Sequence, residues 1–396
     1  MIADVCVIGA GPAGLRAAEV AAEGGARVCV FDAMPSVGRK FLIAGRGGLN
    51  LTSVVETAEF LSSYTGGNSE LWKSLLADFS PEDLRAWAQG LGIETIAASN
   101  SRVYPIGLKS APLLRRWVQR LRAMGVEFRP RHRWVSLHAS SLNIGFTTPD
   151  GPATFETKAL ILALGGGSWP QTGSDATWVS IFRGLVVEVT PLLPANCGWH
   201  VAWTSDFRAK HAGKPLKNIS ATANDHRVPG ELLVTDYGLE GGPLYALGRS
   251  LRAGHDLFLD LRPAFTQEQL LSRLPQTKTF HWQETCERWR LPEIVRDLLE
   301  SHPDRPYWTT AQALAAVVKR CPILIAGPRP LAEAISTAGG VSWQEVSDGL
   351  MLKKHPGVFV CGEMLDWEAP TGGFLMQGAF STGTRAGREA LKSLQA

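Results

Sequence analysis

The chain has few cysteines, and none of them are close together: Cys6, Cys29, Cys197, Cys286, Cys321 and Cys361 are scattered over 396 residues. No pair has the spacing of a zinc clip or of a redox C-x-x-C motif. A disulfide reductase, which needs such a pair beside its cofactor, is therefore excluded. The histidines and carboxylates form no metal-ligand cluster either, so we expect no metal. We expect the cysteines to be small buried hydrophobic residues of a reduced, cytoplasmic protein.

An excess of charge of one sign and long apolar runs are also missing. The 40 Lys and Arg residues nearly balance the 37 Asp and Glu residues, for a net charge of +3. This balance gives no electrostatic reason to expect nucleic acid or an anionic membrane as a partner. No apolar stretch is long enough to span a bilayer, and we expect no signal peptide. The sequence leaves the oligomeric state open.

What is present begins with a glycine motif at residues 4–14, Asp-Val-Cys-Val-Ile-Gly-Ala-Gly-Pro-Ala-Gly. The short apolar run predicts a buried parallel strand, and G-x-G-x-x-G predicts the turn into a helix at about 13–23. A second strand at 27–31 then ends at an acid that can accept hydrogen bonds from a ribose. This context predicts a dinucleotide, with its pyrophosphate on the helix N-terminus. The expected cofactor contacts are Gly9, Gly11, Pro12, Ala13, Gly14, Asp32 and Ala33.

A glycine-rich basic loop follows at residues 38–50. Its glycines free the backbone to approach a planar ligand, while Arg39, Lys40 and Arg46 supply charge and Asn50 an amide. A flexible basic surface loop is the alternative interpretation. From this loop we predict cofactor contacts at Arg39, Lys40, Gly45, Gly47, Gly48 and Asn50.

Two further segments each follow a predicted parallel strand. The strand at 158–164 enters a triple glycine, and the strand at 358–361 precedes an acidic, glycine-rich segment and a helix at about 376–394. Ligands of open α/β sheets lie beyond the carboxyl ends of strands. An acid there can bind the ribityl hydroxyls of a flavin, a role we assign to Asp366, and the helix N-terminus can face the flavin N1/O2 edge. A nicotinamide cofactor needs no such second site, so we predict FAD. The expected contacts are Ala163, Gly165, Gly166, Gly362, Glu363, Asp366, Gly372, Gly373 and Phe374.

Nucleotide-type patterns at both ends of the chain indicate one interrupted α/β domain. We predict a Rossmann-like FAD-binding domain at 1–190 and 335–396. The block between them, 191–334, reads as an insertion that is mainly β at 191–262 and mainly α at 263–334. Within the first domain we expect helices at 55–92 and 110–124 and antiparallel strands over 126–157. In the insertion we expect helices at 266–274, 282–301 and 309–320.

Together these segments resemble the BaiN-like (RdsA, YhiN) family of FAD-dependent NAD(P)H oxidoreductases. The matching motifs cover essentially the whole chain: Gly-Arg-Lys-Phe-Leu-Ile at 38–43, Asn50-Leu51-Thr52, Arg102-Val103-Tyr104-Pro105, Leu164-Gly165-Gly166 with Ser168-Trp169-Pro170, residues 231–235 with Tyr237-Gly238, residues 337–341, and Gly362-Glu363-x-Leu365-Asp366. The resemblance implies FAD in a two-part Rossmann-like domain, with an inserted β-barrel-like and helical domain. It also implies reduction of carbon–carbon double bonds in steroid-like substrates by some members.

Two departures separate this chain from the family pattern. Where the family loop ends Gly-Gly-Gly-Arg-Cys-Asn, this chain has Arg46-Gly47-Gly48-Leu49-Asn50, and where the family has Thr-His it has Thr235-Asp236. We therefore predict a divergent branch.

The predicted function is an FAD oxidoreductase that passes hydride from transiently bound NAD(P)H to a small or medium apolar substrate. A flavin monooxygenase, or a binding or RNA-modification accessory protein with structural FAD, are the alternatives. Candidate catalytic residues are Lys40, Arg46, Asn50 and Tyr104.

Overall fold

A computed structural model describes residues 3–45, 47–138, 141–275 and 280–395. The chain divides into two compact units, Met1–Leu193 with Ile335–Ala396, and Pro194–Ala334. The sequence analysis put these boundaries at 190/191 and 334/335. Each unit buries its own hydrophobic core.

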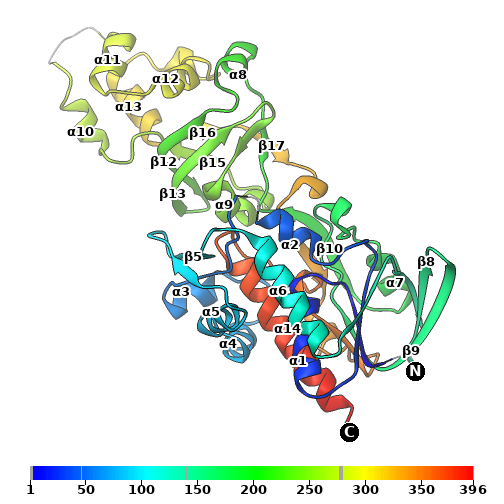
Figure 1. Cartoon of the computed structure of the whole chain (residues 1–396). Coiled ribbons are helices and arrows are strands. Elements are labelled where there is room, and N and C mark those ends of the chain that lie inside the picture. Colours follow the sequence, from blue (N-terminus) through cyan, green and yellow to red (C-terminus); the bar gives the residue numbers. More distant parts are fainter. Residues whose placement is uncertain (1–2, 46, 139–140, 276–279, 396) are drawn as a thin grey trace. The chain divides into compact units, whose positions relative to one another are not determined.

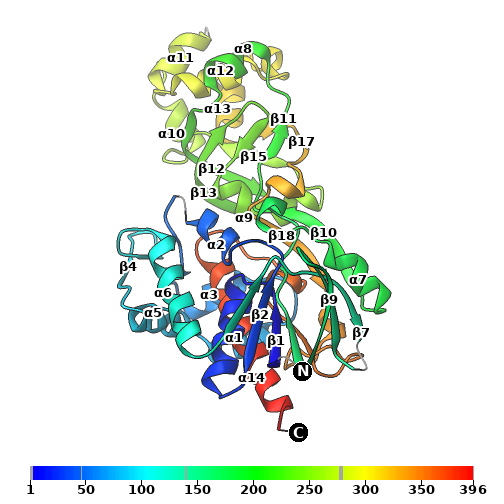
Figure 2. The ribbon, with the colours of Figure 1, turned by 45° about the vertical axis from the view of Figure 1, so that its right-hand side comes forward.

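The first unit is built on a sheet whose central strands are parallel. β1 (Ala3–Ile8) lies between β2 (Val28–Asp32) and β9 (Gly151–Leu162), and β19 (Val358–Val360) pairs with the other side of β9. β1, β2, β19 and the last residues of β9 are apolar and buried on both faces, as parallel strands covered by helices must be. Figure 2 shows β1, β2 and β9 side by side.

The sheet continues at both edges in a way that the sequence only partly predicted. β7 (Arg133–His138), β8 (Asn143–Thr148) and the first half of β9 are antiparallel, as expected for 126–157. β6 (Glu127–Pro130), however, is parallel to β2. The prediction was wrong there because helix α6 (Ser110–Ala123) precedes β6, and a helical crossover returns the chain in the parallel direction.

Two helices far apart in sequence pack closely against each other. α1 (Pro12–Glu23) and α14 (Phe374–Ser393) run side by side in Figure 1. A Cβ added at Gly383 would lie 2.4 Å from the Ala13 carbonyl oxygen, and one at Gly387 would lie 2.7 Å from that of Ala17. Glycine at these positions therefore lets the two backbones approach.

Further helices and short strands complete the first unit. The expected helical region 55–92 contains α3 (Thr57–Ser62), α4 (Ser69–Asp78) and α5 (Pro81–Gly90), the last with a capping box between Ser80 and Asp83. The others are α2 (Arg39–Ala44), α7 (Trp178–Gly184), a small sheet of β3 (Thr52–Ser53), β4 (Thr95–Ala97) and β5 (Arg102–Pro105), and the pair β10 (Val189–Ala195) and β18 (Ser336–Val341).

The second unit contains an antiparallel sheet that nearly closes on itself. Its order is β16 (Cys321–Ile323), β15 (Leu257–Asp260), β12 (Pro215–Ala223), β13 (His226–Val234), β14 (Gly238–Glu240), β11 (Trp199–Val201), β17 (Ile325–Pro328). Only Leu324 separates the two edge strands β16 and β17, so the ends of the sheet meet. The predicted α/β class with a β-barrel-like insertion is confirmed.

Helices complete the second unit. The β-rich half also holds α8 (Ser205–His211) and α9 (Gly242–Arg252), which the sequence analysis missed. The helical half holds α10 (Gln267–Leu271), α11 (Trp282–Arg288), α12 (Glu293–Glu300) and α13 (Ala311–Lys319). The single helix expected at 282–301 is split, because Pro292 cannot donate a helical hydrogen bond and keeps the residue before it out of the helical region.

The structure also tests two expectations from the sequence, buried free cysteines and the lack of a membrane-spanning helix. All six cysteines are free and buried, as predicted, and burial raises the pKa of each thiol, to about 12 for Cys361. Among the described ranges, no helix combines the length and apolarity needed to cross a membrane.

Candidate functional site

A cleft opens in the first unit at the carboxyl ends of β1, β2, β9 and β19. Its empty volume is about 1150 Å³ when the open solvent at its mouth is included. Twelve of the predicted cofactor residues line it: Gly9, Gly11, Pro12, Ala13, Asp32, Ala33, Arg39, Lys40, Ala163, Gly165, Gly362 and Glu363.

In the turn between β1 and α1, two glycines are required by close backbone packing and the third by the open cleft. A Cβ at Gly9 would lie 2.2 Å from the Ala163 carbonyl oxygen, and one at Gly14 would lie 1.9 Å from that of Gly9. A Cβ at Gly11, in contrast, would meet nothing within 4 Å, so this position faces the open cleft. Gly9 and Gly14 serve close backbone packing, and Gly11 keeps the floor of the cleft free for a ligand.

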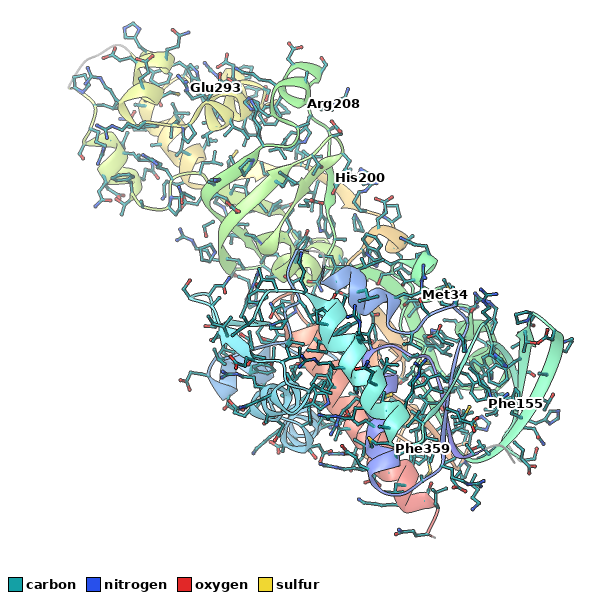
Figure 3. The ribbon with its side chains drawn as sticks, viewed as in Figure 1. Met34, Phe155, His200, Arg208, Glu293 and Phe359 are labelled. Carbon is teal, nitrogen blue, oxygen red and sulfur yellow. The ribbon has the colours of Figure 1, made fainter. Side chains whose placement is uncertain are left out.

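Asp32 ends β2 with its carboxylate fixed at the cleft. Its Oδ2 accepts from the backbone N–H of Ala10 at 2.9 Å, and its Oδ1 from that of Met34 at 2.8 Å. Figure 3 labels Met34, which follows β2. Burial raises the pKa of Asp32 above its ordinary value, although the two N–H groups and the charge of Arg39 oppose the shift.

The N-terminus of α14 forms another part of the cleft wall. Gly373 caps this helix with φ +103°, and a Cβ there would lie 2.4 Å from the backbone of Thr52. Leu375 and Met376 of the first turn line the cleft. The first N–H groups of a helix have no partner within it, so this end can donate to a ligand and carries partial positive charge.

Lys40 and Glu363 form an ion pair at the cleft. The Lys40 Nζ lies 2.7 Å from Glu363 Oε2 and 2.6 Å from the Oγ of Ser168, which is completely buried. Glu363 also accepts from the backbone N–H of Thr337 at 2.8 Å and from that of Gly166 at 3.3 Å. This network joins the basic loop, the end of β9 and the end of β19.

Several predicted residues lie elsewhere in the first unit. Gly45, Gly47, Gly48, Asn50 and Tyr104 do not line the cleft, although the Tyr104 ring lies beside Gly48. Gly14 and Gly166 serve packing behind it, Gly372 and Gly373 immediately precede α14, and Phe374 is its first residue. Arg46 lies outside the described residues.

Asp366 is not the acid of its segment that reaches the cleft. Its Oδ2 accepts a hydrogen bond from the Thr190 hydroxyl at 2.8 Å. Glu363, three residues earlier and directly after β19, lines the cleft instead. The sequence placed both acids beyond the strand but had no means of showing that Thr190 binds one of them.

Sequence reasoning also did not name several other residues at the cleft, some of which lie within the glycine-rich segments. These are Ser168, which anchors Lys40, and the lining residues Ala10, Gly38, Phe41, Ala44, Leu164, Thr172, Gly173, Ser174, Ile335, Ser336, Cys361, Trp367, Leu375, Met376 and Ala379. The Thr172-Gly173-Ser174 stretch after Pro170 is a turn signal that could have indicated a loop here.

The residues present fit a dinucleotide such as FAD. Gly11 leaves an open approach to the backbone at the start of α1, and a carboxylate lies at the end of β2. A buried polar atom of one lining residue, Arg39 Nε, has no hydrogen-bond partner among the described residues. Unsatisfied buried groups next to a cleft are expected where a ligand supplies the missing partner.

Comparisons with known proteins agree with this geometry. The family model described as "HI0933-like protein Rossmann domain" matches residues 3–389. The 3-dehydro-bile acid delta(4,6)-reductase of Clostridium scindens is 26% identical over 97% of this chain and 98% of its own length. The ribosomal RNA dihydrouridine synthase of Escherichia coli K12 is 25% identical, over 96% of each chain.

A solved structure shares the fold over almost its full length. The 3-ketosteroid-delta4-(5alpha)-dehydrogenase of Rhodococcus jostii RHA1, in complex with 4-androstene-3,17-dione, has a TM-score of 0.54 and 15% sequence identity. The alignment covers 98% of this chain and 96% of that one.

Proposed function

The chain belongs to the HI0933-like Rossmann family, and on this basis we propose that it is an FAD-dependent oxidoreductase. We propose further that it reduces a small or medium apolar organic substrate with hydride from transiently bound NAD(P)H. The match over residues 3–389 confirms the family resemblance stated from the sequence motifs.

One observation carries the proposal: a single cleft is lined by both ends of the chain. The turn at Gly11 and the carboxylate of Asp32 suit an adenosine and its pyrophosphate, while Lys40 and the start of α14 line the cleft from other segments. A nicotinamide nucleotide alone needs only the first set. The second set supports a longer cofactor with a redox-active ring.

The chain's own residues have separate tasks in this proposal. The N–H groups at the start of α1 bind the pyrophosphate, and Asp32, already held by two backbone amides, accepts from the ribose hydroxyls. Arg39 adds positive charge and an unpaired Nε donor. When bound, FAD supplies the two-electron redox chemistry, which amino-acid side chains do not.

The lining of the cleft supports an apolar substrate class. Leu375 and Met376, which are partly exposed, bring carbon surface to it. The Clostridium scindens relative is named as a reductase of a bile acid, a largely apolar polycyclic compound. We therefore propose an unsaturated alicyclic compound as the class of substrate.

A spectroscopic experiment tests the proposal. The purified protein should be yellow, and heat should release FAD, as identified by chromatography. Anaerobic NADH or NADPH should bleach the flavin absorbance, and an enone substrate should restore it without oxygen. FMN, or no flavin after reconstitution, would contradict the cofactor assignment. Restoration by air with oxygenated product would indicate a monooxygenase, and no bleaching by either nucleotide would indicate a structural flavin.

A second candidate function is reduction of a base in RNA. The Escherichia coli relative is named as a ribosomal RNA dihydrouridine synthase. In this chain Arg115 and Arg122 are exposed on α6, and Glu127 is the only acidic residue between 109 and 133. A basic face of this kind is suited to a phosphate backbone.

The two candidates differ in a measurable product. Ribosomal RNA from cells that lack the protein would have lost one dihydrouridine if the second candidate holds, and mass spectrometry of the nucleosides detects that loss. An unchanged dihydrouridine content, together with turnover of an enone, supports the first.

A further inference from the structure

Among the residues that the structure describes, Lys40 has acceptors for only two of its three hydrogen-bond donors. An ammonium group has three N–H donors. The structure gives the Lys40 Nζ two acceptors, Ser168 Oγ at 2.6 Å and Glu363 Oε2 at 2.7 Å. The side chain is 27% exposed and lines the cleft. The third N–H is therefore available to a molecule bound there.

Both acceptors are themselves fixed. Glu363 Oε1 accepts from the Thr337 N–H and Glu363 Oε2 from the Gly166 N–H, so the carboxylate is held by two backbone groups. Ser168 has no exposed surface, and its hydroxyl reaches the carbonyl oxygen of Ile335 at 3.5 Å. The ammonium group is thus held in one place by groups that cannot easily turn away.

The arrangement places a positive donor, backed by one carboxylate, against the proposed cofactor. Resting on the proposed function, we propose that Lys40 stabilises the reduced, negatively charged form of the flavin, and that Ser168 and Glu363 position it. Reduction adds negative charge to the flavin ring. A fixed cation that lines the cleft would favour the reduced state of a flavin ring bound beside it and raise the reduction potential.

A purely structural role for the same ion pair predicts something different. The pair also ties the basic loop to the ends of β9 and β19. If this were its whole role, removing it would lower the melting temperature or loosen FAD but leave the reduction potential of retained flavin unchanged. The potential therefore distinguishes the two roles.

The experiment is a dye-coupled anaerobic reduction of the FAD-loaded protein, which needs no substrate turnover. Lys40→Met should shift the reduced-to-oxidised equilibrium at least tenfold toward oxidised flavin, which is about 30 mV for two electrons. Lys40→Arg should stay within threefold of wild type. Glu363→Gln removes the carboxylate that compensates the cation, so it should shift the equilibrium toward reduced flavin. Ser168→Ala should shift it toward oxidised flavin, by less than Lys40→Met does.

A matched control is Lys392→Met, which removes another lysine paired with a glutamate, Glu389, near the far end of α14. It should leave the potential unchanged. An unchanged potential in Lys40→Met, or a shift of the same sign in Lys40→Met and Glu363→Gln, would overturn the inference. If Lys40→Met does not retain FAD, the other two variants test the inference. Opposite shifts of the reduction potential in Glu363→Gln and Ser168→Ala support it, and shifts of the same sign contradict it. Failure of the wild-type protein to bind FAD would instead overturn the proposed function.

Discussion

Two strand–turn–helix segments of the first unit line the same cleft but are built differently. At the N-terminal one, β1 ends at Ile8 and α1 begins at Pro12; at the C-terminal one, β19 ends at Val360 and α14 begins at Phe374. The acid associated with the first, Asp32, is held by backbone amides alone. The acid of the second, Glu363, is held by two backbone amides and by Lys40, a side chain from another segment.

This difference shows that local sequence determines the geometry of a short connection, whereas that of a long one depends on distant residues. A three-residue turn fixes the direction of its helix and the use of each glycine, so one motif carries the geometry. A longer connection has several acids that can reach the ligand, and contacts with distant residues select among them. Thr190 binds Asp366, and Lys40 binds Glu363.

Gly11→Val should have the largest effect, because it blocks the cleft at the N-terminal segment. Gly11 has φ −83°, which valine adopts without strain, and its Cβ position is open. The variant should fold with an unchanged melting temperature but show no measurable FAD binding by fluorescence titration.

Gly184→Val is the matched control, since a Cβ there also meets nothing and the residue ends α7 outside the cleft. Wild-type FAD affinity in Gly11→Val would show that the motif does not hold the pyrophosphate.

Gly373→Val tests the C-terminal segment and should rank second. Its φ of +103° costs valine about 1–3 kcal/mol, and the Cβ would also collide with the Thr52 backbone. We expect a lower melting temperature and, in the FAD-loaded protein, a lower flavin reduction potential, because the start of α14 moves away.

Gly254→Val, at φ +87° with open space around it, separates backbone strain from the collision. An equal loss of stability in both variants, with no change of potential in Gly373→Val, would remove the start of α14 from the flavin site.

Asp32→Ala should weaken FAD binding without abolishing it. Hydrogen bonds to a charged group contribute about 1.5–3 kcal/mol, which corresponds to about 10- to 150-fold in the dissociation constant. Isothermal titration measures the change. The FAD dissociation constant of Asp32→Asn should lie between those of Asp32→Ala and the wild type.

The same residue predicts a pH dependence. Burial raises the pKa of Asp32, so its carboxylate takes up a proton at a higher pH than an exposed aspartate does. Wild-type FAD affinity should accordingly fall on acidification, whereas the affinity of Asp32→Asn should stay flat. Parallel curves for the two proteins would contradict this assignment.

Asp366→Ala should have the smallest effect on the cofactor. Its carboxylate binds Thr190 and does not line the cleft, so we expect FAD affinity within about twofold of wild type. Stability should fall by about 0.5–1.5 kcal/mol, the usual net contribution of one hydrogen bond. Thr190→Val should cost a similar amount in denaturant unfolding. A tenfold loss of FAD affinity in Asp366→Ala would restore its predicted ribityl role.

The sequence predicted well what short-range patterns control. The turn at Gly9, Gly11 and Gly14, the capping box at Ser80 and the α/β class follow from spacing and local hydrogen bonding. The parallel pairing of β6 with β2 depends on a crossover through α6, which alternation of polar and apolar residues does not show.

Within the site, the hydrogen bond between Lys40 and Ser168 and the one between Thr190 and Asp366 join residues that are far apart in sequence. Ser168 and Lys40 are 128 positions apart, and Thr190 and Asp366 are 176 apart. Neither pair leaves a periodic signal in the sequence. Leu375 and Met376 are ordinary apolar residues whose place at the cleft follows only from the packing of α14 on α1.

That packing also has a consequence for biosynthesis. α1 emerges from the ribosome early, whereas α14 follows more than 350 residues later, after an interval on the order of tens of seconds at about 5–20 residues per second. Until then the face of α1 that α14 covers is bare, and the cleft lacks one wall. The unit Pro194–Ala334 is continuous in sequence and can fold during this interval. The cleft is therefore complete only after α14 has been translated, so we expect the nascent first unit to hold no cofactor before then.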